Sequence, residues 1–155
     1  MSQSALLADQ IRRGFEGEAW HGDPVLTLLD GVSAQQAAAH PIKGSHSIWE
    51  LVLHIAAWDG AVLRRAGGMA VELSDRENFP AVLDTSETAW RNALEHMKDT
   101  HDQLIKAVRN FPDARLQERV PGKTEKYYDF YYMFSGIVQH ELYHGGQIAI
   151  LKKAQ

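Results

Sequence analysis

The chain has 155 residues, a formal net charge of −4 and a sequence pI of about 6.0, and it contains no cysteine. This length fits one domain, residues 1–155, with a sizeable core. The acidic balance argues against nucleic acid as a partner, because DNA-binding proteins need clustered Lys and Arg to neutralise phosphates. Without cysteine there are no disulfides, thiolate ligands or cysteine nucleophile, so a thiol reaction would need a thiol supplied by a substrate or cofactor.

Neither the N-terminus nor the apolar runs indicate export or membrane insertion. Asp9 comes too early for the apolar region of a signal peptide. No apolar run approaches the ~20 residues that span a bilayer. We therefore expect a cytoplasmic protein that does not act at a membrane.

The first part of the chain predicts one long helix and two short ones. A long amphipathic helix is expected over residues 4–19, where apolar residues recur every four positions. A short helix is expected over residues 24–29, with Asp23 as its N-cap and a proline at its first position. Another short helix follows Ser33, which forms a capping-box pattern with Gln36, and it ends before the next proline.

Three further long helices are predicted after this segment. The second begins after Ser47, where Ser-x-x-Glu is a capping box, and stops at the glycine pair 67–68. The third begins after Asp84, with a glutamate in the same capping pattern, and ends at Pro112. The fourth covers residues 127–153. Each of these segments carries apolar residues at helical spacing.

Four long amphipathic helices joined by connections of this length predict an all-α fold, a four-helix bundle. Only residues 115–120 suggest a short extended segment. The longer connections, at residues 20–46 and 68–83, are long enough to form the walls of a pocket.

The most informative feature of the sequence is a pair of histidines, His140 and His144, on the apolar face of the last helix. At about 100° per residue, both imidazoles fall within one stripe of apolar residues. A polar pair among core residues costs free energy unless something satisfies it. Two neutral imidazoles one turn apart form half of a divalent metal site. The alternative is a pair of hydrogen-bonded core histidines. The stripe consists of Phe130, Met133, Ile137, Ile148 and Leu151.

The segment from His140 to His144 also matches the H-E-x-x-H pattern of zinc proteases, with Glu141 in the place of the general base. The longer form of that pattern needs a glycine three residues after the second histidine and a third histidine three residues further on. Gln147 and Ile150 occupy those positions, and the last 11 residues contain no carboxylate that could replace the missing ligand. A zinc protease is therefore a poor interpretation.

A third ligand would have to lie upstream, and His54 is the leading candidate. It lies at the edge of the apolar arc of its helix, beside the small residues Ala57 and Ala61, which leave room for an ion. One histidine from one helix and a pair from another commonly build a metal site in a bundle core. Three imidazoles leave positions open for water or substrate, which is typical of catalytic sites. The residues alone equally allow His54 to be no ligand at all.

Two further residues near the pair are candidates for supporting roles. Glu141 could be a base, although the helical rotation turns it away from His140 and favours a structural role or contact with a ligand. Gln147 lies one turn beyond His144 and could orient that ligand, or it could be an ordinary surface amide. No other catalytic residue is identified.

The remaining histidines and the tryptophans have simpler interpretations. His101 lies on the apolar stripe of the third long helix and is best explained as a buried, hydrogen-bonded residue, with a metal-site role as the alternative. His46 either lines the site or is exposed. We expect surface positions for His21, His40 and His96 and core positions for Trp20, Trp49, Trp58 and Trp90.

Three segments together resemble the DinB/YfiT-like superfamily over nearly the whole chain. They are residues 15–22 (FEGEAWHG), 46–58 (HSIWELVLHIAAW) and 140–148 (HELYHGGQI), and the His-x-x-x-His-x-Gly-Gln element of the third is the most specific. The resemblance implies an up-down-down-up four-helix bundle with short extra helices in its connections, and a homodimer. It also implies a divalent metal, which is zinc, nickel or iron, bound by His54, His140 and His144.

The resemblance further implies a class of reaction. Characterised members of the superfamily include transferases and isomerases in which the metal activates a low-molecular-weight thiol. We therefore expect a metal-dependent enzyme with a small-molecule substrate, such as a thiol S-transferase. A metal-dependent hydrolase and a non-catalytic metal-binding module of a stress response are the alternatives.

Overall fold

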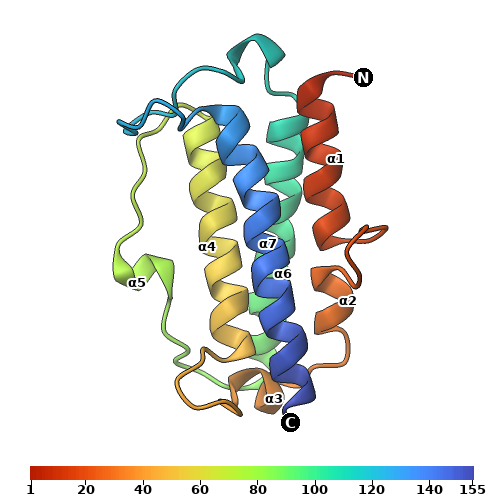
Figure 1. Ribbon diagram of the computed structural model, residues 1–155. Helices are drawn as coiled ribbons and strands as arrows, with labels where there is room; N and C mark the ends of the chain where they lie inside the picture. Colours follow the sequence, from red (N-terminus) through yellow and green to blue (C-terminus); the bar gives the residue numbers. More distant parts are fainter.

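In the computed structural model, which describes all 155 residues, four long helices form a bundle (Figure 1). They are α1 (Gln3–Phe15), α4 (Ile48–Ala66), α6 (Glu87–Arg109) and α7 (Phe130–Lys153). Helices α1 and α7 run in one direction, and α4 and α6 run in the other. The predicted up-down-down-up, all-α bundle is therefore confirmed.

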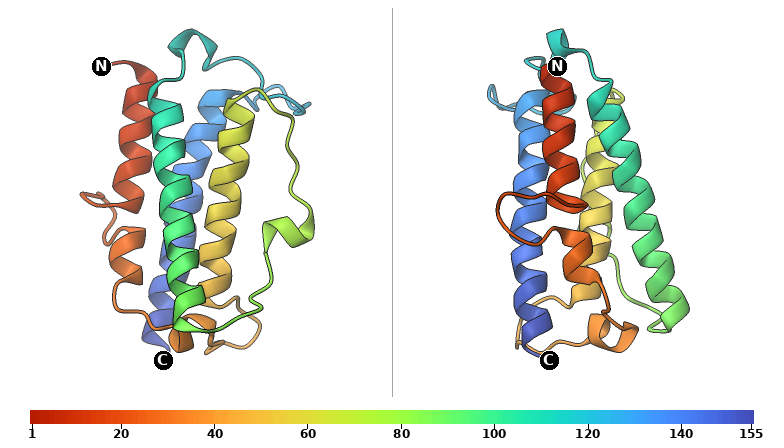
Figure 2. Two further views of the ribbon diagram at one scale, coloured as in Figure 1. Left: turned by 180° about the vertical axis from the view of Figure 1, so that it is seen from behind. Right: turned by 90° about the vertical axis from the view of Figure 1, so that its right-hand side faces the viewer.

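The packing order of the helices differs from their order in the chain. Both α1 and α4 pack against α6 and against α7, so that α6 and α7 lie diagonally across the bundle (Figure 2). A side chain from α7 that points into the centre of the bundle can therefore meet one from α6. This diagonal arrangement determines which polar side chains come together in the core.

Short helices occupy the connections, as expected. The segment between α1 and α4 contains α2 (Val25–Leu29), which extends the column of α1, and α3 (Ala34–Ala38) at the end of the bundle. The segment between α4 and α6 passes along the outside of α4 and contains α5 (Asp75–Asn78). A 3-10 turn, Asp113–Arg115, follows α6.

The capping boxes predicted from the sequence are present where α3 and α4 begin. The Ser47 hydroxyl accepts a hydrogen bond from the Glu50 backbone N–H, and the Glu50 carboxylate accepts one from the Ser47 N–H. Ser33 and Gln36 make the same reciprocal pair. These bonds satisfy backbone donors that have no partner within the helix, and they define where each helix begins.

Four predicted boundaries were wrong. Helix α1 ends at Phe15 and not near residue 19, because the chain turns at Glu18, which has a φ of 61°. Pro24 and not Asp23 is the N-cap of α2, and it makes no side-chain cap bond. The last helix begins at Phe130 and not at residue 127, because Asp129 caps it through the Tyr132 N–H.

The fourth wrong boundary is at the start of α6. Ser86 and not Asp84 caps this helix, through the Ala89 N–H, whereas Asp84 accepts a bond from the Ser86 N–H. The glutamate of the expected cap pair, Glu87, instead accepts a hydrogen bond from the Ala34 N–H at the start of α3. No strand forms over residues 115–120, where only a single bridge links Arg119 and Asp129.

The apolar core consists of two separate clusters. One contains residues of α2, α3, the N-terminal halves of α4 and α6 and the C-terminal half of α7, and the other contains residues of α1 and of the opposite halves of α4, α6 and α7. On each of α4, α6 and α7, one buried polar residue separates the half that belongs to one cluster from the half that belongs to the other. These residues are Asp59, His101 and Glu141. We call these three residues the polar layer.

Two further findings concern the surface. Trp20 is fully exposed, so its expected core position was wrong, whereas Trp49 and Trp90 are buried. The three histidines expected at the surface, His21, His40 and His96, are exposed. No helix of the structure has both the length and the apolar character needed to cross a membrane.

Candidate metal centre

Three imidazoles from two helices meet at one point beside the core. The Nε2 atom of His140 lies 2.9 Å from Nε2 of His54 on α4 and 3.1 Å from Nε2 of His144, one turn further along α7. His54 and His144 are buried and His140 is half-buried. The structure thus brings together the two histidines predicted from the helix pattern and the leading candidate for the third ligand. We call them the three-histidine group.

The hydrogen bonds of His54 and His144 determine where their protons lie. Nδ1 of His54 is 2.7 Å from the backbone carbonyl oxygen of Asn78, and Nδ1 of His144 is 2.6 Å from the side-chain oxygen of Gln147. Because oxygen acceptors of this kind carry no proton, each Nδ1 must be the donor. Both rings therefore present the lone pair of Nε2 to His140.

His140 can satisfy only one of these two lone pairs. A neutral imidazole has a single N–H group, and Nε2 of His140 faces both neighbours while its Nδ1 is buried without a partner. At least one of the two lone pairs therefore receives no hydrogen bond from His140. A cation at the meeting point of the three nitrogens would be coordinated by these lone pairs, since neutral imidazole nitrogens are ligands of divalent metals.

Burial keeps all three rings in the neutral form that a metal requires. Loss of hydration lowers the pKa of His54 to about 4. Burial, reinforced by the neighbouring His144, lowers the pKa of His140 to about 3. Burial also lowers the pKa of His144. Protons therefore do not compete for these nitrogens at neutral pH.

The connection between α4 and α6 holds His54 in place. Phe79, which follows α5, stacks on the His54 ring with centroids 4.0 Å apart, and its other face carries His46 at 3.9 Å. Asn78 also accepts a hydrogen bond from the indole of Trp58 through its side-chain oxygen, at 2.8 Å. The sequence did not identify Asn78 or Phe79, because neither belongs to a motif or to a periodic helix face.

Residues 19–148 match the sequence model of the DinB superfamily. The chain belongs to the DinB superfamily. No curated protein and no solved structure matches it. The match covers most of the chain and includes all three histidines of the group.

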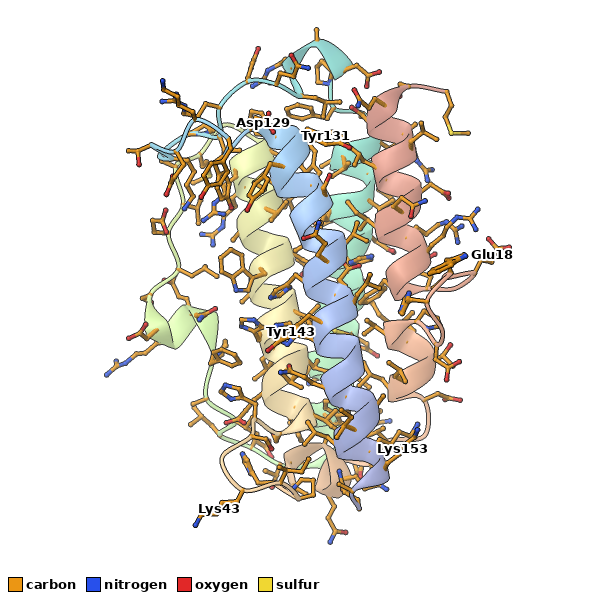
Figure 3. The ribbon with its side chains drawn as sticks, viewed as in Figure 1. Glu18, Lys43, Asp129, Tyr131, Tyr143 and Lys153 are labelled. Carbon is orange, nitrogen blue, oxygen red and sulfur yellow. The ribbon has the colours of Figure 1, made fainter.

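In this DinB superfamily member, a cavity of about 730 Å³ lies against the three-histidine group. His140 and Trp58 line it together with tyrosines of the segment before α7 and of its first turn. Figure 3 shows Tyr131 beside Asp129 at the first turn of α7, and Tyr143 near the middle of the helix. The cavity is mostly apolar, and none of the residues that line it is Lys or Arg.

The two supporting candidates have different positions. Gln147 holds the Nδ1 proton of His144, as described above. Glu141 is fully buried in the polar layer, where its Oε1 lies 3.3 Å from Nδ1 of His101. No carboxylate makes a hydrogen bond to any ring of the three-histidine group. His46 is exposed, and with Gln147 it lines a second, smaller cavity of about 240 Å³.

The sequence contains a signal for the polar layer. His101 lies on the apolar stripe of its helix and is fully buried. Asp59 occupies an equivalent position on α4, between the buried Ile55 and Val62. A carboxylate at a core position of an amphipathic helix is as unusual as a histidine there, and it indicates a buried partner.

Proposed function

We propose that His54, His140 and His144 hold a divalent metal ion and that the protein is a metal-dependent enzyme that acts on a small molecule. The observation that carries this proposal is the meeting of three Nε2 atoms, of which at least two present lone pairs, at distances of 2.9 and 3.1 Å. Asn78 and Gln147 hold two of the rings in this orientation from the far side. Such outer hydrogen bonds are a regular feature of histidine metal sites.

The donor set restricts the metal and its chemistry. Three imidazoles without a thiolate or carboxylate suit zinc, copper, iron or nickel, and of these the resemblance to the DinB superfamily implies zinc, nickel or iron. A bound ion of this kind supplies Lewis acidity and lowers the pKa of a bound thiol or water. Three protein ligands leave coordination positions free, which favours a catalytic role over a purely structural one.

We infer that the reaction is the transfer of a low-molecular-weight thiol to an electrophile. The absence of any carboxylate hydrogen-bonded to the three rings favours this over hydrolysis, because a thiol has a pKa of about 8.5 and loses its proton far more readily than water does. The cavity beside His140, with its tyrosines and without Lys or Arg, suits a neutral, partly aromatic electrophile. The cysteine-free chain cannot supply the thiol itself.

The first test measures metal content. Wild-type protein, His140→Ala, His144→Ala and the control His96→Ala, an exposed histidine on α6, are purified identically and analysed for zinc, nickel and iron. We expect the wild type and the control to carry about one ion per chain more than the two α7 variants do. Equal, negligible metal in all four proteins after loading would refute the proposal.

The second test separates the reactions. The metal-loaded protein is offered an aromatic electrophile with and without a small thiol, and amide and ester substrates without thiol. Conjugation that requires both the thiol and the metal supports the transferase. Hydrolysis without thiol would establish the hydrolase instead, and a metal-loaded protein that turns over none of these substrates would favour a non-catalytic metal-binding module.

A further inference from the structure

The polar layer is a second place in the bundle where ionisable side chains meet. Asp59 from α4, His101 from α6 and Glu141 from α7 are each 0% exposed. They come from three different helices, and Glu141 reaches His101 across the diagonal of the bundle. Apolar residues occupy neighbouring turns of all three helices, so these groups lie inside the core.

One nitrogen of the polar layer faces two carboxylates. Nδ1 of His101 lies 2.9 Å from Oδ2 of Asp59 and 3.3 Å from Oε1 of Glu141. A single N–H can be directed at only one of them, and it makes a hydrogen bond to Asp59. Both oxygens of Glu141 and the second oxygen of Asp59 are buried without any hydrogen-bond partner.

Hydrogen bonds within the cluster therefore leave three buried carboxylate oxygens without a partner. A buried carboxylate without partners costs several kcal/mol. If His101 were protonated, its single positive charge would face two negative carboxylates, and the same Nδ1 N–H could still be directed at only one of them. A divalent cation between the three side chains would neutralise both carboxylates while the imidazole stays uncharged. This arrangement has no net charge, which suits a site without water.

We propose that Asp59, His101 and Glu141 form a second divalent cation site, separate from the three-histidine group. One donor atom from each of the three residues lies within 4.8 Å of the other two. Two ligands of one metal ion, each about 2.1 Å from it, are about 3.0–3.4 Å apart in octahedral or tetrahedral geometry. The observed distances of 2.9 and 3.3 Å match this spacing.

The ligand types distinguish this site from the first. Two carboxylates and one imidazole form a harder donor set than three imidazoles, and such a set favours Mn²⁺ or Fe²⁺ more than the three-histidine group does. The two groups share no residue, although Glu141 directly follows His140 in α7. A cation held by Glu141 would link α7 to α4 and α6 immediately beside the first site.

Helix α1 closes the polar layer on its remaining side. The Phe15 ring stacks on His101 with centroids 3.7 Å apart. A Cβ atom at Gly14 would lie only 3.2 Å from Oε2 of Glu141, so the glycine makes room for the carboxylate. Because the three ligands are fully buried, the cation would enter as the bundle folds and would then exchange slowly. We infer a structural role for it.

The test uses the full chain with His54, His140 and His144 all replaced by alanine, so that only the second site can hold metal. The protein is unfolded in urea with EDTA, refolded with Mn²⁺ and desalted, and Mn²⁺ is counted by elemental analysis. We expect about one Mn²⁺ per chain. Adding Glu141→Gln or Asp59→Asn should lower this content at least about tenfold, whereas the control Asp102→Asn, an exposed carboxylate on α6, should not change it.

Retention of no Mn²⁺ by the folded background protein would overturn the proposal, and so would equal retention by all variants. Either outcome would mean that the polar layer holds only protons. If the background protein does not fold, the wild type decides the question, because Mn²⁺ in the second site couples to one imidazole nitrogen in electron–nuclear double resonance and Mn²⁺ in the first couples to three. The proposed function is independent of this result, since it concerns only the three-histidine group.

Discussion

His54 and His140 are 86 residues apart in the sequence, yet their Nε2 atoms lie 2.9 Å apart. The bond from Nδ1 of His54 to the Asn78 carbonyl leaves only a lone pair on the inner nitrogen of that ring. The contact is therefore favourable only if His140 donates its one proton or if a cation lies between the rings. Because His140 makes the same contact with His144, helix packing and the outer hydrogen bonds place all three ring nitrogens at one point.

Gln147 determines the orientation of His144, and its removal should weaken metal binding. In Gln147→Leu the Nδ1 proton of His144 has no acceptor, so the ring loses its fixed tautomer and direction. We expect a decrease in metal affinity of about 10–100-fold, measured by competition with a chelating dye. Gln147→Glu keeps an acceptor and should restore most of the affinity. Gln139→Leu, an exposed residue on the same helix, is the matched control. An unchanged affinity in Gln147→Leu would contradict this role.

Phe79 supports the site from the connection outside α4. In Phe79→Ala the His54 ring loses its stacking partner, and His46 loses the same partner on the opposite face. Since Phe79 is only half-buried, we expect a loss of about 1–2 kcal/mol in the free energy of unfolding of the metal-free protein, less than for a fully buried phenylalanine. Metal affinity should fall as well. Leu83→Ala, an exposed residue in the same connection, should change neither quantity; equal effects of both substitutions would show that Phe79 has no special role.

The pH dependence of stability follows from the lowered pKa of His140. The pKa is about 3 in the folded protein, and about 6.5 in the unfolded chain. Between these values the unfolded chain binds the additional proton, so the free energy of unfolding falls as the pH decreases below about 6.5. For one histidine the slope is at most about 1.4 kcal/mol per pH unit.

This effect is measured by urea unfolding in EDTA at pH 7 and pH 5, with wild type and His140→Gln. The burial of Asp59 and Glu141, which raises the pKa of each carboxyl, affects both proteins alike and cancels in the comparison. We expect the wild type to lose more stability between pH 7 and pH 5 than the variant does. An equal or larger loss in the variant would rule out a neutral, buried His140.

The cavity beside His140 can be filled without touching the three-histidine group. A Cβ atom at Gly136 would meet no other atom within 4 Å, and this residue lines the cavity. Gly136→Phe should therefore lower kcat/KM for an aromatic electrophile at least about tenfold, with unchanged metal content. Gly146→Phe adds the same ring to an open position of α7 that does not line the cavity, and it should leave kcat/KM unchanged. Equal kcat/KM in the two variants would place substrate binding elsewhere.

Much of the fold could be predicted from the sequence because its causes are local. Ser47 and Glu50 are three residues apart and cap their helix wherever it packs, and an apolar stripe at helical spacing requires a buried face. The pair His140 and His144 was visible for the same reason, since one helical turn brings them together. Boundaries were less reliable where two capping residues competed, as Asp84 and Ser86 do before α6.

The residues that complete the two polar sites depend on the tertiary structure. The sequence alone left His54 undecided, because nothing local indicates which face of α4 meets α7. Asn78 and Phe79 reach His54 only because the connection passes along the outside of α4. Glu141 appeared to be a possible base beside His140, but the diagonal packing of α6 and α7 directs it to His101 and Asp59.

The sequence by itself therefore determined the helices and the two histidines on α7, because hydrogen bonds and side chains within one or two turns specify these features. Only the tertiary structure decided which histidine ring nitrogens meet and which carboxylates are buried. Those properties depend on distances between helices that are far apart in the chain, and the packing of the apolar residues around them determines these distances.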